Sequence, residues 1–126
     1  MHPYRVVLLG IASLGLSQGV WAEDEATGLR DPSEMTVEER TVIMQRMNDY
    51  NGCVYKEAMA RVEKLPDIRQ AADEGMGACQ GALDKLGETI EGYRFTPAFA
   101  EQFVHHAQNR VVKMLLPELS MRKGGQ

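Results

Sequence analysis

Residues 53–79 read CVYKEAMARVEKLPDIRQAADEGMGAC, a segment that begins and ends with the two cysteines of the chain. Pro66 lies at its midpoint and follows Leu65, for which a proline at the next position disfavours the helical conformation. Proline also suits the first turn of a new helix. The segment therefore predicts two antiparallel helices joined at residues 65–67, with the cysteines equally far from the turn.

Residues equally distant from such a turn lie side by side, so Cys53 and Cys79 are expected to face each other within the reach of a disulfide. An even number of cysteines in an exported chain also favours this bond. It would close a loop of about 26 residues and contribute roughly 3–4 kcal/mol of stability. A redox or metal-binding pair is the alternative, but the C-x-x-C spacing of reactive thiols is missing.

The flanking sequence continues the helical pattern, with apolar side chains at steps of three and four residues. Thr36 and Glu39 have the spacing of a capping box, so the first helix is expected over residues 37–64. The second helix is expected over residues 67–91, and the third over residues 97–116.

The apolar stripe of each helix predicts its buried face. In the first helix the stripe comprises Ile43, Met47, Tyr50, Val54, Ala58, Val62 and Leu65. In the second helix it comprises Ile68, Ala72, Gly75, Cys79, Leu83, Leu86, Ile90 and Tyr93. In the third helix it comprises Phe99, Phe103, Ala107, Val111 and Met114. Pro117 is then expected to break or kink the third helix, because a proline inside a helix removes a hydrogen bond.

No segment shows the alternation of a strand, so the fold class is expected to be all-α. The architecture would be a small up-down-up three-helix bundle, or a helical hairpin plus a third helix, stapled by one disulfide. The helical domain is expected over residues 36–123. Residues 23–35 are acidic and lack an apolar period, so they are expected to form a flexible arm.

Residues 1–22 have the layout of a secretory signal peptide. Arg5 precedes an apolar run over residues 6–16, which is shorter than the roughly 18 residues that a membrane-spanning helix needs. Cleavage is expected after Ala22, so the protein would be exported to the periplasm or secreted. A membrane anchor is the alternative.

Charge and composition exclude some classes of partner. The chain of 126 residues has a formal net charge of −4. It therefore lacks the basic surface expected of a nucleic-acid-binding protein or of a polybasic membrane binder. No transmembrane segment is expected after signal cleavage.

Small side chains along the second helix suggest an interaction surface. A groove of Ala71, Gly75, Ala78 and Ala82 would let another helix approach closely, either within the chain or from a partner. A kink at residues 75–77 that shapes a pocket is the alternative explanation for the glycines. Tyr55 lies off the stripe of the first helix and is therefore a candidate for a surface contact.

Two pairs of side chains are weak candidates for metal binding. Met44 and Met47 carry thioethers of the kind that bind Cu(I), and His105 and His106 add imidazoles. Adjacent helical residues point about 100° apart, however, so the two histidines cannot easily share one metal ion. Because the C-x-x-C-H motif is also missing, no cofactor is expected.

The sequence contains no nucleophile elbow, phosphate-binding loop or zinc-protease signature, and no enzymatic activity is expected. The function that the sequence favours is a non-enzymatic binding module that contacts an unidentified protein or a second copy of itself. A metal- or haem-binding carrier that uses methionine and histidine is the first alternative. An enzyme whose motif is not evident is the second.

Overall fold

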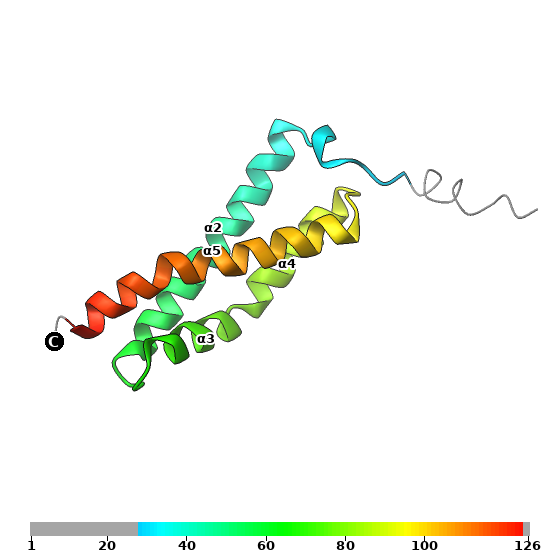
Figure 1. The fold of residues 1–126 in the computed structure, drawn as a ribbon. Coiled ribbons are helices and arrows are strands. Elements are labelled where there is room, and N and C mark those ends of the chain that lie inside the picture. Colours follow the sequence, from blue (N-terminus) through cyan, green and yellow to red (C-terminus); the bar gives the residue numbers. More distant parts are fainter. Residues whose placement is uncertain (1–27, 125–126) are drawn as a thin grey trace, which may run out of the picture.

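The computed structural model describes residues 28–124, and they form a helical bundle (Figure 1). The predicted signal peptide, residues 23–27 and residues 125–126 lie outside the described residues. The elements are η1 (Pro32–Glu34), α2 (Val37–Val62), α3 (Ile68–Ala78), α4 (Gln80–Gly92) and α5 (Pro97–Gly124). This confirms the all-α fold class. Within the described range, no helix is both long and apolar enough to cross a membrane.

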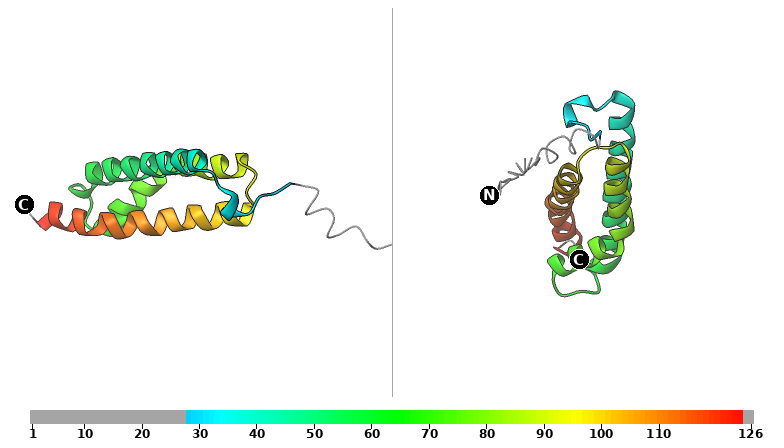
Figure 2. Two further views of the ribbon diagram at one scale, coloured as in Figure 1. Left: turned by 90° about the horizontal axis from the view of Figure 1, so that it is seen from above. Right: turned by 90° about the vertical axis from the view of Figure 1, so that its right-hand side faces the viewer.

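The helices follow the predicted up-down-up order (Figures 1 and 2). α3 and α4 return along α2 after the turn at Pro66, so that α2 is one arm of a hairpin and α3 and α4 are the other. α5 then packs against both arms. The ammonium group of Lys123 donates hydrogen bonds to the carbonyl groups of Val62, at 3.3 Å, and Leu65. These bonds hold the end of α5 against the turn that joins α2 to α3.

The core consists of the faces that the helices turn toward one another. In α2 the buried residues are Ile43, Met47, Tyr50, Val54, Ala58 and Val62, as the stripe predicts. A capping box fixes the start of this helix. The amide of Glu39 donates to Thr36 Oγ1 at 3.1 Å, and the amide of Thr36 donates to Glu39 Oε1 at 2.9 Å. Both bonds satisfy amides that a helix start leaves without intrahelical partners.

The prediction of one helix over residues 67–91 is wrong, because the helix is broken at Cys79. This residue has φ −106° and ψ 16°, and it ends α3 and begins α4. Gly75, Gly77 and Gly81 surround the break and lower the cost of leaving the helical conformation, since glycine is a poor helix former. Cys79 is also joined covalently to Cys53 of α2, so the break lies at the link between the helices.

The predicted end of the third helix is wrong, and its predicted face is correct only in part, since Ala107 and Val111 are buried as expected. α5 continues through Pro117, which is exposed, to Gly124. Phe99 and Phe103 are half-buried, and Met114 is 51% exposed. The residues of α5 that are buried are Ala100, Ala107, Val111, Leu115 and Leu119.

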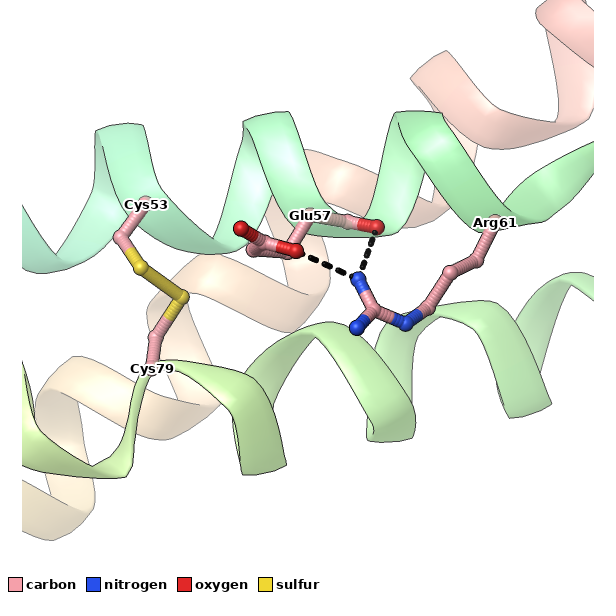
Figure 3. The surroundings of a disulfide bond; sticks show 4 residues. All are labelled: Cys53, Glu57, Arg61 and Cys79. Atoms are coloured by element: carbon pink, nitrogen blue, oxygen red, sulfur yellow. Dashed lines mark hydrogen bonds and ion pairs between the residues drawn. A yellow bond between two sulfur atoms is a disulfide. The ribbon is translucent and has the colours of Figure 1, made fainter.

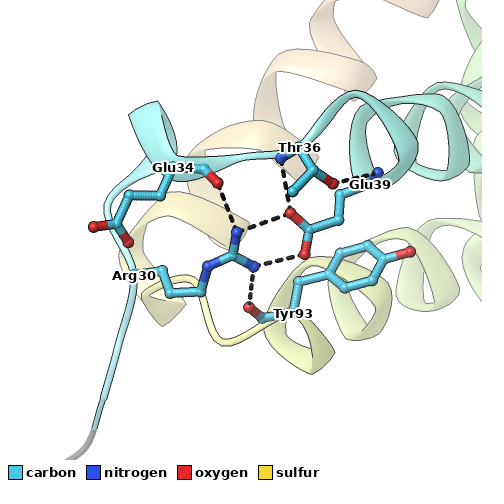
Figure 4. A network of polar contacts seen from close by, with 5 residues as sticks. All are labelled: Arg30, Glu34, Thr36, Glu39 and Tyr93. Carbon is cyan, nitrogen blue, oxygen red and sulfur yellow. Dashed lines mark hydrogen bonds and ion pairs between the residues drawn. The ribbon is translucent and has the colours of Figure 1, made fainter.

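The part of the predicted arm that the structure describes packs against the bundle (Figure 4). Arg30 donates to both carboxylate oxygens of Glu39, at 2.6 and 2.9 Å, and to the carbonyls of Tyr93, at 3.0 Å, and Glu34, at 2.7 Å. Its guanidinium also lies 4.7 Å from the centre of the Phe95 ring. Residues 28–35 therefore join the start of α2 to the turn between α4 and α5, instead of forming a loose arm.

Candidate functional site

The two cysteines form the predicted disulfide (Figure 3). The Cα atoms of Cys53 and Cys79 are 5.9 Å apart, and Cys79 is buried. Along the same helix as Cys53, the guanidinium of Arg61 lies 2.6 Å from the carboxylate of Glu57. The hydrogen bond from Arg61 lowers the pKa of Glu57. A paired cysteine has no thiolate to act as a nucleophile or metal ligand, so in this state the disulfide is a structural link between α2 and the α3–α4 break.

The predicted small-residue groove does not form one surface. Ala71 and Gly75 are buried, and a Cβ atom built on Gly75 would lie 3.0 Å from the backbone nitrogen of Ala58. This half of the groove is the contact between α3 and α2. Ala78 is exposed, and Ala82 is half-buried on α4, beyond the break at Cys79. The glycine therefore allows close packing within the chain.

Tyr55 borders a pocket of about 270 Å³ between α2 and α5, which we call the Tyr55 pocket. Its lining comprises Asn51, Tyr55, Val111, Met114, Leu115 and Glu118. Tyr55 is 45% exposed and Met114 is 51% exposed, so both are large apolar side chains on the surface. The prediction that Tyr55 is a surface residue agrees with this arrangement.

Two polar groups of the Tyr55 pocket lack partners. Asn51 Oδ1 is buried and accepts no hydrogen bond from any residue of the described chain. Glu118 is exposed and makes no hydrogen bond or ion pair with residues 28–124. The lining contains no basic side chain. The pocket therefore presents the exposed carboxylate of Glu118 beside an apolar wall, whereas Asn51 Oδ1 is closed off from solvent.

Sequence reasoning missed Asn51 and Glu118. Asn51 lies four residues before Tyr55, and Glu118 lies four residues after Met114, so each pair shares one face of its helix. That spacing is visible in the sequence. The sequence does not show, however, that these two faces meet, because this depends on the register between α2 and α5.

A second pocket, of about 240 Å³, lies between α4 and α5. Its apolar lining comprises Leu83, Ala100 and Val104. Its acidic lining comprises Asp84, Glu88, Glu91 and Glu101. Gly87 lets the helices approach closely here, since a Cβ atom on it would lie 3.3 Å from Val104 Cγ2. The acidic residues are exposed, as expected for a solvated helix surface.

The candidate metal ligands lie in different environments. Met47 is buried in the core, whereas Met44 is 40% exposed. His105 and His106 are exposed on α5. In residues 28–124, no group of three or more histidine, cysteine, aspartate or glutamate side chains is placed so that it could hold a metal ion.

The Tyr55 pocket differs from the other surface features because it combines exposed apolar side chains with unpartnered polar groups. The acidic pocket between α4 and α5 is not lined by any of the exposed large apolar side chains. Comparison of the chain with protein-family models, curated proteins and solved structures finds no match. The function must therefore be inferred from the surface of the molecule.

Proposed function

We propose that this chain is a small exported helical protein that binds another protein through the Tyr55 pocket. The observation that carries the proposal is the exposure of Tyr55 and Met114 around one concave surface. Tyrosine and methionine are enriched at protein interfaces, and arginine, tyrosine and tryptophan supply most interface hot spots. The bundle that presents this surface is held by a disulfide, so little conformational entropy would be lost on binding.

The proposed location of the protein outside the cytoplasm has two supports. The sequence of residues 1–22 is typical of a signal peptide, and disulfides persist mainly in oxidising compartments. Trp21 is the single tryptophan of the chain and lies within the segment that would be removed. The purified exported protein should therefore begin at Glu23 and show tyrosine but no tryptophan fluorescence. A protein that retains Met1 and tryptophan emission would contradict export with cleavage.

Site-specific crosslinking tests the proposed interface. A photoreactive phenylalanine analogue in place of Tyr55, in the full chain expressed in its own compartment, should give a discrete adduct. The same analogue at Gln70, which is exposed on α3 and outside the pocket, is the control. Met114→Asp in the Tyr55-labelled protein should abolish the adduct, because the charge would disrupt the apolar wall of the pocket.

Three results would contradict this interface. They are no adduct at position 55, an equal adduct at position 70, and an adduct that persists after Met114→Asp. Circular dichroism of the Met114→Asp protein must show unchanged helicity, so that the loss reports on the surface alone. An adduct with twice the mass of the chain would identify self-association in place of a different partner.

A further inference from the structure

We infer that the Tyr55 pocket accepts an arginine side chain of the partner protein. This inference rests on the proposed function, because it names the chemistry that the proposed interface would recognise. The volume of about 270 Å³ is below the roughly 300–1,000 Å³ of typical small-molecule sites. The pocket is therefore of a size for one long side chain and not for a whole cofactor.

The apolar part of the pocket fits the stem and the flat face of a guanidinium side chain. Val111, Met114 and Leu115 form the wall that α5 contributes. Long cationic side chains lay their methylene groups along such surfaces and keep the charged end near water. The ring of Tyr55 adds an aromatic face, on which arginine stacks more readily than lysine.

The polar part of the pocket favours a positively charged hydrogen-bond donor on the ligand. Glu118 is an exposed carboxylate without a partner in the described chain, and it borders the pocket. A cationic donor beside this carboxylate would form a charge-assisted hydrogen bond, which is stronger than a neutral one. A guanidinium group has five N–H donors in one plane and can donate to both oxygens of one carboxylate at once.

Other side chains match these groups less well. Norleucine, an uncharged side chain of similar length, would cover the apolar wall but leave the carboxylate of Glu118 unpaired. Lysine would bring a compact charge that does not stack on the tyrosine ring in the same way. An acidic or phosphorylated side chain would be repelled by Glu118.

Titration of the isotope-labelled full chain with capped amino acids tests this assignment by nuclear magnetic resonance. The probes are the N-acetyl, N′-methylamide derivatives of arginine, lysine and norleucine. Arginine should shift the amide signals of Tyr55, Met114 and Glu118, with an affinity about fivefold to tenfold higher than that of norleucine. Added salt should reduce this preference, because the ion pair with Glu118 is near the surface.

Two glutamates of α5 provide the matched variants. Glu118→Gln should remove most of the preference for arginine over norleucine. Glu101→Gln changes the same kind of residue in the acidic pocket between α4 and α5, and it should leave the preference unchanged. Equal binding of the three probes, or no shift at the pocket, would overturn the arginine assignment, as would an equal effect of the two variants.

The outcome separates this inference from the proposed function. If crosslinking at position 55 depends on Met114 but arginine is not preferred, the partner binds through other chemistry and only the arginine assignment fails. If crosslinking also fails, the interface itself is wrong. Shifts of the same amide signals on raising the concentration of the protein alone would show that a second copy occupies the pocket, which overturns the assignment to a partner protein.

Discussion

Gly75 is the residue at which α3 comes closest to α2. A Cβ atom there would lie 3.0 Å from both the backbone nitrogen and the Cβ atom of Ala58. Alanine favours helix, but it would force the two backbones apart. We therefore expect Gly75→Ala to lower the free energy of unfolding by about 1–3 kcal/mol, the usual cost of overpacking. Urea denaturation followed by circular dichroism measures this change.

Gly52 provides the control for this substitution. It lies inside α2 and is exposed, and a Cβ atom on it would meet no other atom within 4 Å. Gly52→Ala should therefore raise the free energy of unfolding by about 1 kcal/mol through helix propensity alone. If both substitutions stabilise the protein, the close contact between α3 and Ala58 is not a constraint on the fold.

Glu39 gives the stability of the protein a specific dependence on pH. The hydrogen bond from Arg30, together with the amide of Thr36, lowers the pKa of Glu39 from 4.5 to about 2. Because the pKa is lower in the folded protein, ionised Glu39 stabilises the fold above about pH 4.5. This contribution is lost as the pH falls toward 2 and the carboxylate becomes protonated.

Glu39→Gln should therefore be less stable than the unmodified protein near neutral pH. The difference should shrink as the pH falls through the range between the two pKa values and disappear at its lower end. Thermal unfolding measured across this range checks the expectation, with the exposed neighbour variant Glu38→Gln as the control. A difference that does not change with pH would show that Arg30 does not hold the charged form of Glu39.

At the scale of the helices, the buried face is predicted best where the apolar residues follow a single, clear helical period. α2 begins at a capping box, and its apolar stripe contains large residues. Its buried face was therefore predicted correctly. In α5 the residues Phe99, Phe103 and Met114 are larger than Ala100 and Ala107. Size therefore favoured Met114, which is exposed, over Ala100, which is buried, although Ala107 and Val111 of the predicted stripe are buried as expected.

The break at Cys79 could not be located from local preferences alone. Glycines at positions 75, 77, 81 and 87 lower helix propensity over four turns, and they do not select one position. Cys79, which is bonded to Cys53, is the residue at which α3 ends. The Tyr55 pocket has a similar origin, because its residues come together only when the register of α2 against α5 is known.

Pro117 lies inside α5, although proline locally disfavours the continuation of a helix. Proline lacks the amide hydrogen that an interior helical residue donates, and its ring crowds the preceding turn. The helix nevertheless continues to Gly124, past buried Leu119 and the hydrogen bonds of Lys123. We infer that these contacts offset the local cost of the proline.

Pro117→Ala should therefore stabilise the protein. The expected gain is about 1–3 kcal/mol, because proline costs up to about 3 kcal/mol more than alanine inside a helix. Thermal unfolding measures the gain. The control is Ser120→Ala, which changes an exposed residue of the same helix without altering a proline. A loss of stability in Pro117→Ala would show that the proline does not carry this local cost in α5.

In the molecule as a whole, three kinds of link join the helices at different positions along the bundle. Arg30 joins the start of α2 to the turn between α4 and α5. Lys123 joins the end of α5 to the turn after α2. The disulfide joins α2 to the break between α3 and α4. The apolar core lies between these links, and a chain of this length buries only a modest core.

The disulfide should be the strongest of the three links. Cys53 and Cys79 are 26 residues apart, and closing a loop of this length lowers the entropy of the unfolded chain by an amount equivalent to about 3–4 kcal/mol. For a domain near this size each kcal/mol shifts the melting temperature by about 4–8 °C. The double variant Cys53→Ser, Cys79→Ser should therefore melt about 10 °C or more below the unmodified protein.

A reducing agent separates the effect of the bond from that of the serine side chains. It should lower the melting temperature of the unmodified protein and leave that of the double variant unchanged, since only the former has a bond to cleave. Mass spectrometry before reduction should show the unmodified protein two hydrogens lighter than its dithiol form. If reduction leaves the melting temperature unchanged, the packing of α3 and α4 on α2 does not depend on the bond. The break at Cys79 would then have to come from the surrounding glycines alone.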